Sequence, residues 1–187
     1  ALPIYFVHIS SAAIYGDAAG KIDESQPLEP TGSEYGDMKL AAENVAWDYY
    51  DQGLPLTVIR PSIVYGPFSR TWTVEMAAKL QSGNWAVFDG FGEGWCNLVY
   101  VSDLVAAIRL AATNEKAVGH AFNIIGPERI TWNDYFLKFS RALGMPELPH
   151  KPPESARGRA LLMEPVRALG KFGLAHFEYP IKWLGYR

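Results

Sequence analysis

Short apolar segments separated by helical ones constrain the fold of this chain more than any other feature. Three of them, at residues 3–9 (PIYFVHI), 56–60 (LTVIR) and 121–125 (AFNII), have the length of strands. Their nearly continuous apolar character predicts burial on both faces, which is typical of strands in a parallel sheet. A further short strand is expected at residues 98–101 (LVYV).

Helices are expected between these strands. An Ala-rich run predicts a helix at residues 33–51 that ends near Gly53, and a second helix is expected at residues 73–80. Two more helices are expected to follow Ser102 and Thr131, with those side chains as N-caps. Strands that alternate with helices predict an α/β fold with a parallel sheet.

Small and polar residues follow the first two predicted strands. Ser10 and Ser11 come directly after the first strand, and Pro61 and Ser62 come after the second. Ligands of such sheets bind beyond the carboxyl ends of the strands. If the two strands are neighbours, these residues face one crevice.

A tyrosine and a lysine lie four residues apart at the head of the first predicted helix, in the stretch YGDMK. This spacing places Tyr35 and Lys39 on one helix face, about 6 Å apart along the axis. Glu43 continues the same stripe, and we expect it on the helix surface. A phenol beside an ammonium can give or take a proton at a carbinol or carbonyl, and a hydroxyl such as that of Ser11 can hold the substrate oxygen. The hydride would have to come from a cofactor, because no side chain supplies one.

Each of these motifs, taken alone, can be explained by structure without any function. A Tyr-x-x-x-Lys pair is common on solvated helix faces, and a serine pair after a strand is usually a turn. The net charge of −3 gives no basic stripe for nucleic acid, and no apolar run approaches the roughly 20 residues of a spanning helix. The four histidines lack metal-ligand spacing, and the single Cys96, which allows no internal disulfide, fits a cytoplasmic protein.

Taken together, HISSAAIYGD, YGDMKLAAE, IRPSIVYGP and NLVYVSDLVAAI resemble the extended short-chain dehydrogenase/reductases, the NAD-dependent epimerase/dehydratase group. The resemblance covers most of residues 3–143. It implies the second half of a Rossmann-type doubly wound parallel sheet plus a small α/β substrate-binding lobe. The NAD(P)-binding domain would take residues 1–67 and 98–126, and the substrate lobe would take residues 68–97 and 127–187.

The resemblance also implies roles for individual residues. Tyr35 would be the catalytic acid/base, Lys39 would lower the pKa of Tyr35 and bind the nicotinamide ribose, and Ser11 would bind the substrate oxygen. The implied substrate-binding residues are Ser11, Ala12, Ala13 and Tyr35. The implied NAD or NADP-binding residues are Ile9, Ser10, Tyr35, Lys39, Pro61, Ile63 and Val64. No metal is expected.

The glycine-rich phosphate loop of that family is not found in this sequence. The segment GFGEGW at residues 90–95 has the wrong spacing for it. We therefore expect the chain to be the carboxyl-terminal part of a larger enzyme, with the amino-terminal half of the sheet, about a hundred residues at roughly 30 per βαβ unit, as its missing partner. Alone, it should expose an apolar sheet edge and bind NAD(P) weakly. A homodimer through the helix that carries Tyr35 is expected from the family.

The resemblance leaves three functions open. The first is an enzyme that moves a hydride between a carbinol or carbonyl carbon and nicotinamide, on a small-molecule substrate such as a nucleotide sugar. The second is a 3β-hydroxysteroid-dehydrogenase-like enzyme or ketone reductase, because Ile63 stands where many nucleotide-sugar enzymes have Asn, and Cys96 lies near the place of an Arg that meets a diphosphate. The third is a non-catalytic, truncated module that keeps the NAD-binding fold.

Overall fold

The computed structural model of the protein describes residues 5–18, 20–88, 90 and 92–152. It divides into two compact units. The first comprises Ala1–Thr73 and Asn97–Glu128, and the second comprises Val74–Cys96 and Arg129–Arg187, each as far as it is described. Which unit binds cofactor and which binds substrate stays a prediction.

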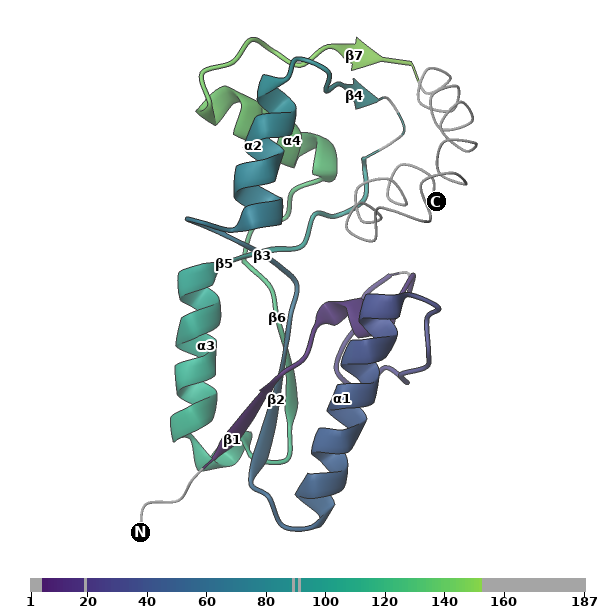
Figure 1. Cartoon of the computed structure of the whole chain (residues 1–187), viewed down its shortest axis with the longest axis vertical. Coiled ribbons are helices and arrows are strands. Elements are labelled where there is room, and N and C mark those ends of the chain that lie inside the picture. Colours follow the sequence, from purple (N-terminus) through teal and green to yellow (C-terminus); the bar gives the residue numbers. More distant parts are fainter. Residues whose placement is uncertain (1–4, 19, 89, 91, 153–187) are drawn as a thin grey trace. The chain divides into compact units, whose positions relative to one another are not determined.

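A parallel three-stranded sheet forms the centre of the first unit (Figure 1). Its order is β1-β2-β6, with β2 in the middle, so β1 and β6 are its edges. Phe6 pairs with Leu56, and Ile9 pairs with Ile59 at the carboxyl end of the pair. The strands span Phe6–Ile9 (β1), Leu56–Pro61 (β2) and Ala121–Ile124 (β6).

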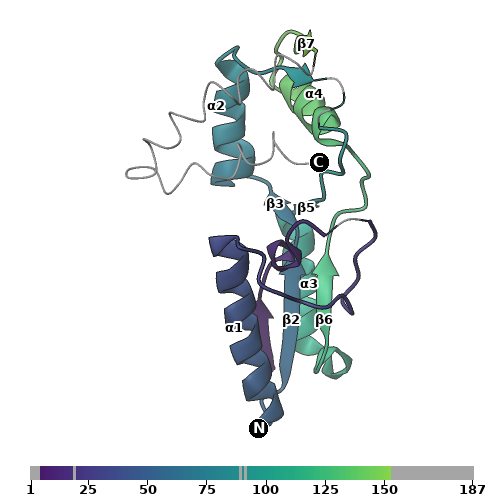
Figure 2. The same cartoon turned by 90° about the vertical axis from the view of Figure 1, so that its right-hand side faces the viewer.

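Helices α1 (Glu34–Asp51) and α3 (Val101–Thr113) cover opposite faces of this sheet, as Figures 1 and 2 show. Alternate residues of β2 serve the two faces: Val58 packs with residues of α1, and Ile59 packs with residues of α3. Every residue of β2 is buried for this reason, which explains why its sequence is mostly apolar. The predicted parallel α/β arrangement is confirmed for this unit.

Smaller elements complete the first unit. β3 pairs in parallel with β5, and short helical turns flank the main strands. These elements span Ala12–Tyr15 (η1), Ile63–Tyr65 (β3), Leu98–Tyr100 (β5) and Glu115–Ala117 (η3). The π-helical turn Arg70–Glu75 (η2) contains the boundary between the two units.

The described residues of the second unit form two helices and a short parallel strand pair. Its elements are Met76–Gln81 (α2), Val87–Phe88 (β4), Trp132–Ala142 (α4) and His150–Lys151 (β7). Thr131 caps α4 as predicted, in a reciprocal capping box with Asp134. The described residues contain no helix that is both long and apolar enough to cross a bilayer.

Several local predictions need correction. Helix α3 begins at Val101, with Tyr100 rather than Ser102 in the cap position, and the Ser102 hydroxyl donates to Asp103 instead. The helix predicted at residues 73–80 is divided into η2 and α2. The strands β3, β4 and β7 were not predicted, because two or three residues carry too little periodicity to be recognised.

Candidate active site

The residues that follow β1 and β2 lie together at the carboxyl end of the sheet, because the two strands are parallel neighbours. The Ser10 amide donates to the Ile59 carbonyl at 2.8 Å, which extends the pairing one residue beyond the strand. Ser11 then caps η1, and its Oγ accepts a hydrogen bond from the Ala13 amide at 3.1 Å. Ser11 therefore stands at the carboxyl end of β1, in a turn whose backbone is held at its start.

Helix α1 brings Tyr35 and Lys39 to the same end of the sheet. Ser33 caps the helix, and the Asp37 carboxylate accepts from the amides of Thr31 and Gly32 at 2.6 and 3.0 Å. Lys39 Nζ donates to the Ile9 carbonyl at 3.1 Å, and it lies 6.0 Å from the centre of the Tyr35 ring.

A close approach joins this helix to the Ser11 turn. A Cβ placed on Gly36 would lie 2.8 Å from the Ala13 carbonyl oxygen and 3.2 Å from Thr31 Oγ1. Glycine is therefore required in the first turn of α1, where it lets η1 contact the helix backbone. Tyr35, beside this glycine, keeps 38% of its surface exposed, so a ligand can reach it.

The other residues assigned to the cofactor lie at the carboxyl ends of β1 and β2 or shortly after them in the chain, and their exposures differ. Ile9 is 36% exposed, whereas Ser10 and Pro61 are buried. Ile63 and Val64 belong to β3, and Val64 also packs against the apolar cluster under α3. The assignment of these residues to the cofactor stays a prediction.

The expectation that Glu43 lies on the helix surface is wrong. Its side chain is fully buried, and it pairs with Arg60 of β2, which is 4% exposed. Arg60 Nη2 and Nε lie 2.5 and 3.1 Å from Glu43 Oε1, and Trp47 Nε1 donates to the same oxygen. Burial is the largest single effect and would raise the pKa of Glu43, but the hydrogen bonds and charge of Arg60, together with hydrogen bonds from neighbouring side chains such as Trp47, outweigh it and hold that pKa below its ordinary value.

Sequence reasoning missed this network, although a signal for it was present. Residues 56–60 read as a buried strand, so the Arg60 guanidinium needed a buried acceptor, and Glu43 follows Lys39 by one helical turn. Tyr15 and Asn123 also belong to the network, because Arg60 Nη1 donates to the Tyr15 hydroxyl and this hydroxyl donates to Asn123 Oδ1. Neither residue carries a local pattern that would reveal this role.

His8 and Cys96 are two potentially reactive side chains outside the predicted group of Ser11, Tyr35 and Lys39. His8 lies on β1, and burial lowers its pKa, which favours the neutral ring. Its Nε2 has no hydrogen-bond partner among the described residues. Cys96 is buried and burial raises its pKa to about 12, so its thiol is inert at neutral pH.

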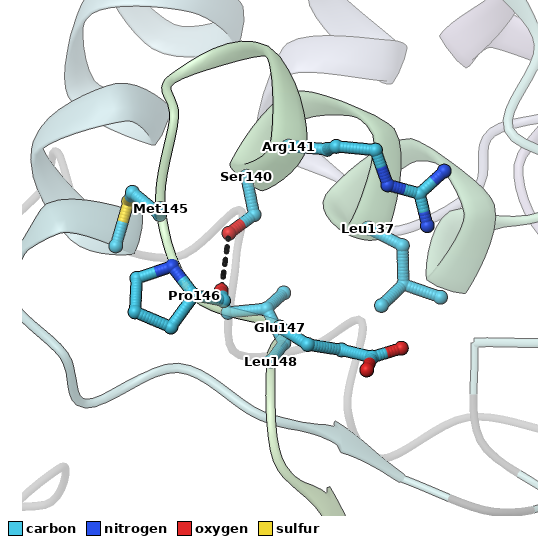
Figure 3. Close-up of a pocket in the computed structure, with 7 residues that line it drawn as sticks. All are labelled: Leu137, Ser140, Arg141, Met145, Pro146, Glu147 and Leu148. Carbon is cyan, nitrogen blue, oxygen red and sulfur yellow. Dashed lines mark hydrogen bonds between the residues drawn. The ribbon is translucent and has the colours of Figure 1, made fainter.

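A surface pocket of about 170 Å³ lies in the second unit, between the end of α4 and the segment that follows it (Figure 3). Apolar side chains line it together with Arg141 and Glu147, and Ser140 Oγ donates to the Pro146 carbonyl at 3.4 Å. It contains none of the predicted site residues. Within the described ranges no group of three His, Cys, Asp or Glu side chains could hold a metal ion.

The sequence model of the NAD dependent epimerase/dehydratase family matches residues 2–124. The chain is 33% identical over 131 residues to an uncharacterised UDP-glucose epimerase, YtcB, of Bacillus subtilis, covering 66% of this chain and 40% of that protein. It is 32% identical over 123 residues to the dTDP-D-glucose 4,6-dehydratase of Homo sapiens, covering 64% of this chain and 35% of that protein. The chain thus spans well under two thirds of the length of these relatives.

Two solved structures show the same architecture. One is a dTDP-glucose 4,6-dehydratase from Bacillus anthracis in complex with NAD, at a TM-score of 0.65 and 26% identity, covering 79% of this chain and 49% of that one. The other is a UDP-glucuronic acid 4-epimerase from Bacillus cereus in complex with NAD, with the same TM-score and identity, covering 80% of this chain and 50% of that one. The likeness confirms the predicted Rossmann-type fold.

Proposed function

Because this chain belongs to the NAD dependent epimerase/dehydratase family, we propose that it is part of an NAD-dependent enzyme that acts on a nucleotide sugar. The observation that carries the proposal is the position of three side chains near the carboxyl end of β1. Ser11 follows β1, Lys39 donates to the last carbonyl of the same strand, and Tyr35 lies exposed one helical turn before Lys39.

The residues present fit a nicotinamide at the carboxyl end of β1. Lys39 Nζ uses one of its three donors on the Ile9 carbonyl, which leaves two for ribose hydroxyls. NAD held there would supply a hydride acceptor for a carbinol carbon and, in an epimerase or dehydratase, the same hydride for the later return, so that no net oxidation would result. We assign the remaining contacts to Ile9, Ser10, Pro61, Ile63 and Val64.

Each catalytic residue then has a defined task. Tyr35 removes the proton of the sugar hydroxyl while the hydride leaves, and gives it back when the hydride returns. Ser11 Oγ already accepts from the Ala13 amide, so its hydroxyl hydrogen is the part that can be donated to the sugar oxygen. Ala12 and Ala13 border the same oxygen from η1.

The chain is proposed to be the carboxyl-terminal part of this enzyme. It spans about half the length of the solved NAD complexes it resembles, and its sheet edge at β1 is lined by Phe6 and Ile9, which are 47% and 36% exposed. A further strand of the amino-terminal half would pair with this edge, and that half would hold the adenosine and pyrophosphate of NAD. The first unit would then belong to the NAD-binding domain and the second to the substrate lobe.

A homodimer through α1 is also proposed. Met38, Val45 and Tyr49 lie seven and four residues apart on one helix face, and each is more than half exposed. The enzyme is proposed to be cytoplasmic, in keeping with the free, buried thiol of Cys96.

A turnover assay on the whole protein tests the function. Purified enzyme is offered UDP- and dTDP-sugars with NAD, and the products are separated by chromatography, with a hydroxysteroid and a simple ketone plus NADH as the alternative substrates. Tyr35→Phe should lower kcat by at least about a hundredfold, in the range expected for a lost acid/base group. Turnover of the alternative substrates alone would assign a reductase, and unchanged turnover in Tyr35→Phe would remove the mechanism.

A further inference from the structure

A buried ion pair fixes the orientation of the Arg60 guanidinium. Arg60 Nε donates to Glu43 Oε1 and Oε2 at 3.1 and 3.2 Å, and Nη2 lies 2.5 Å from Oε1. Both side chains are almost fully buried, Glu43 on α1 and Arg60 on β2. A guanidinium is planar and rigid, so two engaged nitrogens also fix the direction of the third, Nη1.

The third nitrogen points at Tyr15, the last residue of η1. Arg60 Nη1 donates to the Tyr15 hydroxyl at 2.6 Å, and the guanidinium lies 5.4 Å from the centre of the Tyr15 ring. The same hydroxyl donates to Asn123 Oδ1 on β6 at 2.9 Å. The phenol therefore uses its acceptor and its donor on groups of two different strands, and its position is determined by both.

The opposite end of η1 is the Ser11 cap. Only three residues, Ala12–Ile14, separate Ser11 from the anchored phenol of Tyr15, and the Ala13 amide donates to Ser11 Oγ within that turn. Gly36 of α1 lies against the Ala13 carbonyl. The turn that carries Ser11 is therefore held at its start by the Ser10 pairing, in its middle by α1, and at its end by Tyr15.

We propose that Tyr15, oriented by Arg60 and Glu43, is a positioning residue for the Ser11 hydroxyl. It touches neither substrate nor cofactor. It holds η1 so that the Ser11 hydroxyl and the Tyr35 phenol, which stands on the same helix as Glu43, converge on one substrate oxygen. The inference rests on the proposed function, and it adds three residues to which no role in the reaction is otherwise assigned.

A double-mutant cycle in the whole protein tests this role. Tyr15→Phe removes the hydroxyl and keeps the ring, and it should lower kcat by about tenfold to a hundredfold with KM nearly unchanged, since a small misplacement of a reacting group costs that much. In a Ser11→Ala background, where no hydroxyl remains to be positioned, Tyr15→Phe should cause no further loss. Equal losses in both backgrounds, or no loss in the wild-type background, would overturn the proposal.

Amide hydrogen exchange gives a second readout that needs no turnover. The Ala13 amide should exchange at least about tenfold faster in Tyr15→Phe, because the turn opens locally, while amides of β2 keep their protection. Tyr50→Phe, near the far end of α1, is the matched control and should leave Ala13 unchanged. Unchanged Ala13 exchange in Tyr15→Phe also overturns the proposal. Full activity in Tyr35→Phe would instead contradict the proposed function. The exchange of the Ala13 amide would then still show whether Tyr15 holds the Ser11 turn in place.

Discussion

The Glu43 carboxylate shows how completely the role of one residue depends on a partner far along the chain. It follows Tyr35 and Lys39 at helical spacing, yet it points into the protein and binds Arg60, 17 residues away in sequence. Removing one partner of a buried ion pair leaves the other charge uncompensated, which costs roughly 3–5 kcal/mol. Glu43 is therefore a structural anchor on the same helix as the proposed proton donor.

Glu43→Gln should lower the free energy of unfolding by roughly 3–5 kcal/mol at pH 7. It should also flatten the acid limb of the stability curve. The folded pKa of Glu43 lies below its ordinary value of 4.5, so the unfolded chain binds the proton first, and wild-type stability falls as the pH drops from about 5 toward the folded pKa. Urea unfolding between pH 3 and 7 measures both effects.

Glu115→Gln, at an exposed position in η3, is the matched control for this experiment. It should retain the wild-type acid limb because Glu43 is intact. An equally steep acid limb in Glu43→Gln would show that other carboxylates carry the pH dependence.

Cys96 gives a prediction about reactivity. Because burial raises the pKa of this thiol to about 12, it should not react with iodoacetamide in the folded protein at pH 8. In 8 M urea, where the thiol is exposed, labelling should be complete within minutes. Mass spectrometry of the labelled protein measures both states, and fast labelling of the folded protein would contradict the burial.

At the scale of elements, the contact between α1 and η1 decides the geometry of the candidate site. Gly36→Ala raises intrinsic helix propensity by about 1 kcal/mol, but the new Cβ would meet the Ala13 carbonyl oxygen at 2.8 Å. Backbone atoms must shift to relieve this contact. We therefore expect Gly36→Ala to lower stability by about 1–3 kcal/mol, as overpacking does, and to lower kcat by displacing the Ser11 turn.

Ala42→Gly, at an exposed site on the same helix, measures the propensity effect alone. It should cost about 1 kcal/mol and leave kcat unchanged. Denaturant unfolding and turnover of both variants compare the two effects. A stabilised Gly36→Ala protein would mean that η1 does not press on α1.

At the scale of the whole molecule, the first unit has two exposed apolar surfaces that we expect to be covered by other parts of the proposed enzyme. One is the β1 edge with Phe6 and Ile9, which we assign to the amino-terminal half of the sheet. The other is the stripe of Met38, Val45 and Tyr49 on α1, which we assign to a second copy. The two surfaces lie on different elements, so their partners can be separated by mutation.

Val45→Asp should convert the whole protein from dimer to monomer, because it places a charge in the centre of the proposed apolar interface. Size-exclusion chromatography with light scattering measures the mass. Asn44→Asp, which adds the same charge at the neighbouring exposed position, is the matched control and should remain dimeric. A dimeric Val45→Asp protein would place the subunit contact elsewhere.

The sequence by itself determined the parallel α/β class, the three strands of the main sheet, helix α1 and the Thr131 cap of α4. These features follow from local periodicity and cap chemistry, which act within a few residues. It also singled out Ser11, Tyr35 and Lys39, whose catalytic roles stay predictions.

Only the tertiary structure decided which polar residues are buried together. The contacts of Arg60 with Glu43 and Tyr15, and of Tyr15 with Asn123, join residues 17 to 108 positions apart. No period in the sequence encodes such pairs, because they depend on how a helix docks on a strand and on which strand lies next to it. The same reason explains why Ser102 is not the N-cap of α3, as the sequence predicted. Helix α3 begins directly after β5 ends, so Tyr100 takes the cap position whatever the preference of the Ser102 hydroxyl.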